Sequence, residues 1–135
     1  MINERLGDEM VNLFIPHRWN TDDYEVISKL LDRTAYVIKD YSIPEYMPLD
    51  KIDRRYHVDP KIQSKIKWAS LIVCSNRPAL SGGMAIEEIK FATSVGKPIV
   101  AVKVTENDNR ELKELGVSII PCRRDSLEYW IKENL

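Results

Sequence analysis

Short apolar runs alternate with longer amphipathic stretches along most of this chain. Five of the runs have the length of strands and are rich in Val, Ile and Leu, which is typical of buried β-strands. They cover residues 10–17, 35–40, 70–75, 97–104 and 117–122. The third run, SLIVCS, is apolar throughout, so we expect it near the centre of a sheet.

The stretches between these runs carry helical signals. We expect helices over 21–33, 60–69, 84–95, 109–116 and 126–134. Thr21 is predicted to cap the first helix, with Asp22 and Asp23 at its positive end. Asp59 followed by Pro60 predicts the start of the second, since proline is favoured at the first helical position.

This order of elements predicts the fold class. Apolar strands that alternate with helices indicate a parallel sheet covered on both faces. With right-handed crossovers, the expected fold is a flavodoxin-like, doubly wound α/β sheet of about five parallel strands, formed by residues 1–135 as one domain. The loop over 41–58 is unusually long, and loops of that length are usually functional or disordered.

Composition narrows the classes of partner and compartment. The formal net charge is -1 and no block of like charges occurs, which argues against nucleic acid as the main partner. Cys74 and Cys122 each end an apolar run and are expected to be buried free thiols of a reducing compartment. Neither a secretory leader nor an apolar run long enough to span a membrane is visible, so we expect a cytoplasmic protein.

Polar and aromatic side chains gather where the predicted strands end. In doubly wound sheets ligands bind beyond the carboxyl ends of the strands. Each candidate there also has an ordinary structural explanation, such as a turn cap, a surface ion pair or packing under a helix. The candidate substrate-binding residues are His17, Arg18, Trp19, Asp40, Ser42, Ser75, Asn76 and Met84.

Glu88 is the residue that departs from the pattern of its own helix. At about 100° per residue it falls inside the apolar arc formed by Ala85, Ile89 and Ala92, whereas Glu87 falls toward the polar side. A buried carboxylate must find a partner, change its pKa or face a cleft. The alternatives are a satisfied structural acid, paired with Arg18 or a backbone donor, and an acid that serves a binding site.

The segment EIKFATSVGKPIVAV, which begins at Glu88, resembles the TIR-like domain family typified by the sensor of bacterial Thoeris antiphage systems. Members of that family carry Glu-Ile, a small residue four positions after the Glu, and Gly-Lys-Pro-Ile before a strand. Here these are Glu88, Ile89, Ala92 and residues 96–99. LFIPHRW near the start and KDYS after the second strand are also similar, so the resemblance covers nearly the whole chain. The family often has a tryptophan just before this Glu, where this chain has Gly82-Gly83-Met84.

The resemblance implies that Glu88 is catalytic in cleavage of the nicotinamide N-glycosidic bond of NAD. NAD would be the substrate rather than a cofactor, and the product an ADP-ribose-derived signal that activates a separate effector in antiviral defence. The chain is a possible homo-oligomer. An oxocarbenium-like state makes a carboxylate useful, and neither a metal nor a second acid is required. The loop over 41–58, with its tyrosines and Met47, either closes over the substrate and keeps water out, or is a disordered connector or an oligomer contact.

Two other functions stay open. A nucleoside deoxyribosyltransferase-like enzyme would have a similar sheet, a Glu on a comparable helix and a similar Gly-Lys-Pro strand. Its usual Asp-Gly before the helix is missing, because Ser81 precedes Gly82 here. A TIR-like interaction module without catalysis would use Glu88 only as a buried structural acid. Product analysis with NAD and with deoxynucleosides separates these possibilities.

Overall fold

The sheet is flavodoxin-like, as the alternation of elements predicts. A computed structural model describes residues 10–18, 21–42 and 58–135. Its five strands are all parallel and lie in the order β2-β1-β3-β4-β5, with β3 at the centre. The strands are β1 (Met10–Phe14), β2 (Val37–Asp40), β3 (Leu71–Ser75), β4 (Ile99–Lys103) and β5 (Ser118–Pro121). The predicted fold class and the central place of the third run are therefore confirmed.

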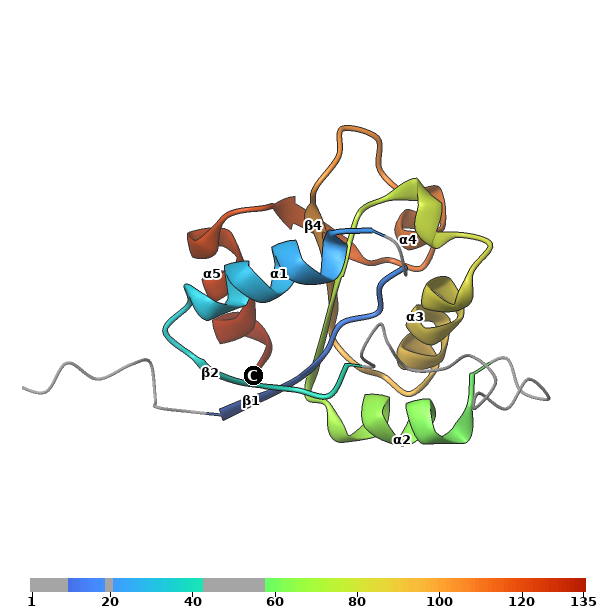
Figure 1. Ribbon diagram of the computed structural model, residues 1–135, viewed down its shortest axis with the longest axis horizontal. Helices are drawn as coiled ribbons and strands as arrows, with labels where there is room; N and C mark the ends of the chain where they lie inside the picture. The colour runs from blue at the N-terminus through green and yellow to red at the C-terminus, as the bar shows by residue number, and fades with distance from the viewer. Residues whose placement is uncertain (1–9, 19–20, 43–57) are drawn as a thin grey trace, which may run out of the picture.

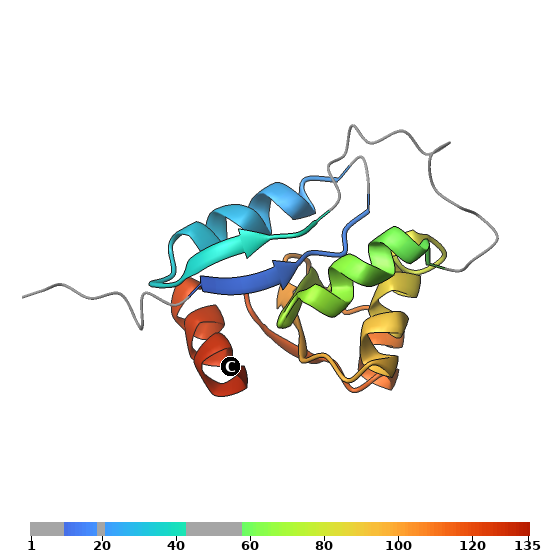
Figure 2. The same ribbon diagram turned by 90° about the horizontal axis from the view of Figure 1, so that it is seen from below.

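Helices cover both faces of this sheet, so the molecule has three layers (Figures 1 and 2). Helices α1 and α5 pack on one face, and α2, α3 and α4 cover the other. The helices are α1 (Asp23–Asp32), α2 (Pro60–Trp68), α3 (Met84–Ser94), α4 (Arg110–Glu114) and α5 (Arg124–Asn134), with a short 3-10 helix, η3 (Pro78–Leu80), before α3.

Alternation along the strands divides the core between the two faces. Leu13 and Ile15 pack toward α1 and α5, while Phe14 between them packs toward α2 and α3. Every residue of β3 is buried, because this strand is covered on both sides. Such double burial explains why the sequence of the central strand is apolar rather than alternating.

Some local predictions need correction. Strand β1 ends at Phe14 rather than His17, although residues 15–17 remain buried. Thr21 does not cap α1: the N-cap position belongs to Asp22, and the Thr21 hydroxyl donates to the Arg18 carbonyl at 2.7 Å. The prediction at Asp59 is confirmed, since its carboxylate accepts from the Lys61 amide at 2.8 Å.

Both cysteines are free, as expected, but only Cys74 is fully buried and Cys122 is half-buried. Burial raises the pKa of the Cys74 thiol to about 12, so this thiol does not supply a nucleophile near neutral pH. Among the residues that the structure describes, no helix has the length and apolar character to cross a membrane.

The Gly-Lys-Pro segment after α3 has a structural explanation of its own. Gly96 adopts φ +77°, the left-handed conformation that ends many helices, and its amide donates to the Thr93 carbonyl at 3.1 Å. The Lys97 ammonium donates to the Lys67 carbonyl at 2.8 Å, and the Pro98 carbonyl accepts from the Ile72 amide at 3.0 Å. These residue types are thus accounted for by the connection from α3 to β4.

Substitution of Gly96 by Ala should lower the free energy of unfolding by about 1 kcal/mol, because an L side chain disfavours positive φ. Among the described residues, an added methyl group would meet no atom within 4 Å other than those of Gly96 and its chain neighbours. Asn tolerates this conformation better, so Gly96→Asn should lose less. Chemical denaturation of both variants tests the point, and equal losses would show that backbone conformation is not the cause.

Candidate functional site

The strand order places a topological switch point between β1 and β3. The chain leaves β1 toward β2 on one side, and β3 lies on the other side of β1. Ligands of doubly wound sheets bind at such a point, beyond the edge at which the strands end, which we call the carboxyl edge. Phe14 of β1 pairs with Ile72 of β3. His17 and Ser75 follow these two paired residues by three positions each. These two residues therefore flank the switch point.

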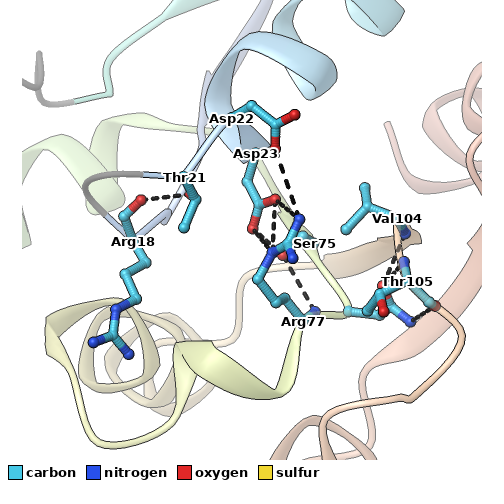
Figure 3. Close-up of polar contacts among 9 residues, drawn as sticks. Arg18, Thr21, Asp22, Asp23, Ser75, Arg77, Val104 and Thr105 are labelled. Carbon is cyan, nitrogen blue, oxygen red and sulfur yellow. Dashed lines mark hydrogen bonds and ion pairs between the residues drawn. The ribbon is translucent and has the colours of Figure 1, made fainter.

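An ion pair closes one side of the carboxyl edge (Figure 3). Asp23, at the first position of α1 and 1% exposed, is held by the guanidinium of Arg77, with Nη2 at 2.7 Å and Nε at 3.0 Å. The Ser75 hydroxyl donates to the same carboxylate at 2.7 Å. The start of α1 is thereby tied to the end of the central strand, and the Ser75 hydroxyl hydrogen is committed within the protein.

Asn76 is fully buried and fixes the loop after β4. Its side-chain oxygen accepts from the amides of Val104 and Thr105 at 2.8 and 3.2 Å, and its amide nitrogen donates to the Thr105 carbonyl and the Asp108 carboxylate, both at 2.8 Å. These bonds use the polar atoms of the side chain. The predicted substrate contact of Asn76 thus has a structural competitor that occupies the same atoms.

On the other side of β1, Ser42 and Asp40 join the ends of β1 and β2. The Ser42 hydroxyl accepts from the Ile15 amide at 2.7 Å, and the Asp40 carboxylate accepts from the Ser42 amide at 2.7 Å. The same carboxylate accepts from the Tyr24 hydroxyl of α1. Burial, and then the bond to Asp40, raise the pKa of Tyr24 to about 12, so this hydroxyl remains protonated.

His17 lies between these two groups of contacts. It is 7% exposed, its Nδ1 lies 2.7 Å from the Ile15 carbonyl oxygen, and its ring centroid lies 4.8 Å from that of Tyr24. The other ring nitrogen, Nε2, is buried and has no hydrogen-bond partner among the described residues. Of the predicted substrate-binding residues that the structure describes, His17 is thus the one with an unsatisfied buried polar atom.

The remaining candidates are more exposed or lie elsewhere. Arg18 is exposed, and its guanidinium points away from Asp23 and donates to the Ala79 carbonyl at 2.7 Å (Figure 3). Met84 opens α3 and is 41% exposed. Trp19 and the segment 43–57, on which the predicted lid depends, lie outside the described residues.

Glu88 is buried, as its helical angle predicts. Glu88 is 8% exposed, whereas Glu87 lies on the outer side of α3 and pairs with Lys90 at 3.4 Å. Ala92, one turn later, packs with Phe14 and Ile72. A helix that connects parallel strands runs back along them, so Glu88, about 6 Å before Ala92, lies closer to the carboxyl edge.

The carboxyl group of Glu88 is unpaired within the described part of the chain, and the guanidinium of Arg18 bonds elsewhere. Burial alone raises the pKa of Glu88 to about 8. The group is therefore mostly protonated at neutral pH, and it can donate a proton to a leaving group. A cation bound beside it would favour the ionised form, which can stabilise positive charge.

Two residues of this edge escaped the sequence analysis. Arg77 showed no pattern of its own, and Asp23 was expected at the helix start but not as a buried ion-pair partner. The pair joins positions that are 54 residues apart, and neither periodicity nor capping rules report contacts across that separation. The described residues contain no cluster of three His, Cys, Asp or Glu side chains suited to a metal ion.

Comparison with known proteins adds little to this geometry. No family model matches the chain, and no curated protein sequence matches it. A solved structure of a CMP N-glycosidase from Clostridium botulinum, BcmB, aligns with 94% of this chain and 100% of its own, with 18% identity and a TM-score of 0.49. So weak a similarity identifies neither the family nor the substrate of this chain.

Replacement of Asp23 by Asn should destabilise the fold by about 2–3 kcal/mol. Loss of one partner of a buried pair costs about 3–5 kcal/mol, and the partial exposure of Arg77 reduces that figure. Asp22→Asn is the matched control, because that carboxylate is 73% exposed and lies 3.7 Å from Arg77. Thermal and urea unfolding should separate the two variants clearly. Equal stabilities would contradict the assignment of Asp23 as the anchor of α1.

Glu88→Gln should change the pH dependence of stability. The pKa of the Glu88 carboxyl is 4.5 in the unfolded chain and about 8 in the folded protein. Between these pH values the folded protein holds a proton that the unfolded chain has released. Stability of the parent should therefore fall as pH rises through this window. Gln has no such proton, so the variant should gain relative to the parent by about 2–5 kcal/mol between about pH 5 and 8.5, at about 1.4 kcal/mol per pKa unit. A gap that stays constant with pH would show that the carboxyl is not desolvated.

Proposed function

We propose that this chain cleaves the N-glycosidic bond of a nucleotide-type substrate, with Glu88 as the catalytic carboxyl group. The supporting observation is the place of Glu88: a buried carboxyl, unpaired among the described residues, near the carboxyl edge of a doubly wound sheet. A purely structural acid at that depth would be expected to have a partner, as Asp23 has in Arg77.

The chemistry suits such a group. As the bond between the ribose carbon and the base nitrogen breaks, its electron pair leaves with the base and positive charge develops on the ribose. A neutral base accepts a proton as it leaves, and protonated Glu88 can supply that proton. Water then bonds to the ribose carbon and gives up a proton, which restores the protonated carboxyl group. Nicotinamide in NAD is already cationic before cleavage and needs no proton, so ionised Glu88 would instead stabilise the charge on the ribose.

A finer proposal takes NAD as the substrate and an ADP-ribose-derived signal as the product, with a separate effector and Thoeris-type antiviral defence as its setting. Its support is the resemblance of the Glu88 to Ile99 block to the TIR-like family, which implies that Glu88 matches the family's catalytic Glu. A second candidate is a neutral nucleoside or nucleotide as the substrate. The burial that keeps Glu88 protonated favours this candidate, because only a neutral leaving base requires a proton donor.

Incubation of the protein with NAD, AMP, CMP and deoxynucleosides, followed by chromatography with mass detection, tests the reaction class. CMP enters the panel because the weakly similar BcmB is named for it. Glu88→Gln should lower cleavage by roughly 10²–10⁴-fold, the usual contribution of a proton-transfer or charge-stabilising group. Glu87→Gln, one residue away and ion-paired on the outer side, should retain the activity of the parent.

The pH profile of kcat/KM then distinguishes the two substrates. If Glu88 donates a proton to a neutral base, activity should fall as pH rises through about 8. If Glu88 acts as a carboxylate beside NAD, activity should rise toward the same pH. Because Thoeris sensors are switched on by infection, the panel is repeated with protein from phage-infected cells. Full activity of Glu88→Gln toward the cleaved substrate would refute the proposed role.

A further inference from the structure

The imidazole of His17 has its two nitrogens in different situations. Nδ1 lies 2.7 Å from the carbonyl oxygen of Ile15, and a carbonyl oxygen can only accept. Nδ1 therefore carries the hydrogen and donates it. In the neutral ring, Nε2 is then left with a lone pair and can act only as an acceptor.

That acceptor is unsatisfied. Nε2 is sealed from solvent and has no hydrogen-bond partner among the described residues. An orphaned buried acceptor costs about 1–3 kcal/mol, so proteins rarely keep one without a reason. Three other buried polar side chains at this edge, those of Asp23, Ser75 and Asn76, are bonded within the protein, and only Glu88 is likewise unpaired among the described residues there.

The ring is also held firmly in place. It packs against Tyr24, whose hydroxyl donates to Asp40 at the end of β2, and Nδ1 is fixed by the backbone of β1's own extension. Three elements therefore set the direction of Nε2 before any ligand arrives. A preorganised group loses little conformational freedom on binding, which is a property of ligand-binding residues.

We infer that His17 binds the substrate, with Nε2 accepting a hydrogen bond from a neutral donor of a nucleotide: a ribose hydroxyl or an amino group of the base. The inference rests on the proposed function for the class of ligand, and on the geometry of His17 for the chemistry. Because Nε2 is buried, local movement must admit the donor, and the new bond then relieves the cost of the unsatisfied atom.

This arrangement has a consequence for specificity. A site built to bond a substrate hydroxyl or amino group discriminates against the analogue that lacks it, because the buried acceptor is then left unpaired again. His17 should thus make the protein prefer either ribonucleotides over their deoxy forms or amino bases over oxo bases. The imidazole acts by positioning the substrate, while bond cleavage depends on Glu88.

The test measures binding in a Glu88→Gln background, so that no turnover is needed. The probes are AMP and CMP, their 2′-deoxy and 3′-deoxy forms, and IMP and UMP, in which the amino group is replaced by a carbonyl. His17→Phe keeps a ring against Tyr24 but loses both nitrogens. By calorimetry, His17→Phe should weaken binding of the nucleotide that carries the critical donor by roughly tenfold. Binding of the analogue that lacks this donor should not change. Glu25→Gln, an exposed change on α1, should bind like the parent.

Nitrogen NMR of the imidazole in the same background gives a readout that does not depend on the His17 variant's folding. The Nε2 signal should shift when the bound nucleotide carries the donor and stay in place when it does not. An unmoved Nε2 signal on saturation, equal weakening of all analogues, or failure of every probe to bind would overturn the inference. A different outcome would refute the proposed function alone. In it, Glu88→Gln binds nucleotides in a donor-dependent way, but the unmodified protein cleaves none of them in any condition.

Discussion

The ion pair between Asp23 and Arg77 is the interaction on which the carboxyl edge of this sheet depends. It joins the first turn of α1 to the chain that leaves the central strand, and the Ser75 hydroxyl completes the bonds to the same carboxylate. Asn76, next in the chain, fixes the loop after β4. Ser75, which ends β3, and the next two residues thus bond to α1 and to the loop after β4. These bonds fix the elements beside the switch point.

Against this background, the isolation of Glu88 is significant. Asp23 and Glu88 are both buried acids near the same edge, and they differ in whether a cation faces them. The paired acid stabilises the fold, whereas the unpaired acid remains neutral and costs stability as pH rises. A fold with well-satisfied contacts elsewhere can tolerate such a group, and groups of this kind concentrate at functional sites.

The sequence predicted what depends on periodicity and missed what depends on long-range pairing. Five strands, five helices and the inward face of Glu88 follow from apolar spacing, which burial enforces locally. The prediction that Thr21 caps the first helix was wrong. Asp22 holds the N-cap position, and α1 begins at Asp23, which pairs with Arg77. Nothing in the spacing of residues 23 and 77 indicates that contact. The unsatisfied nitrogen of His17 likewise appears only when all its neighbours are known.

In the proposed function, the charge of the substrate would decide the protonation state of Glu88. A neutral nucleotide beside Glu88 leaves the desolvated carboxyl protonated, which is the form that a neutral leaving base requires. A cationic nicotinamide would lower the pKa of the same group and produce the carboxylate that an oxocarbenium-like ribose requires. One unpaired acid can therefore serve either leaving group, since the bound substrate determines its protonation. A permanent cation next to Glu88, such as the one next to Asp23, would remove that choice.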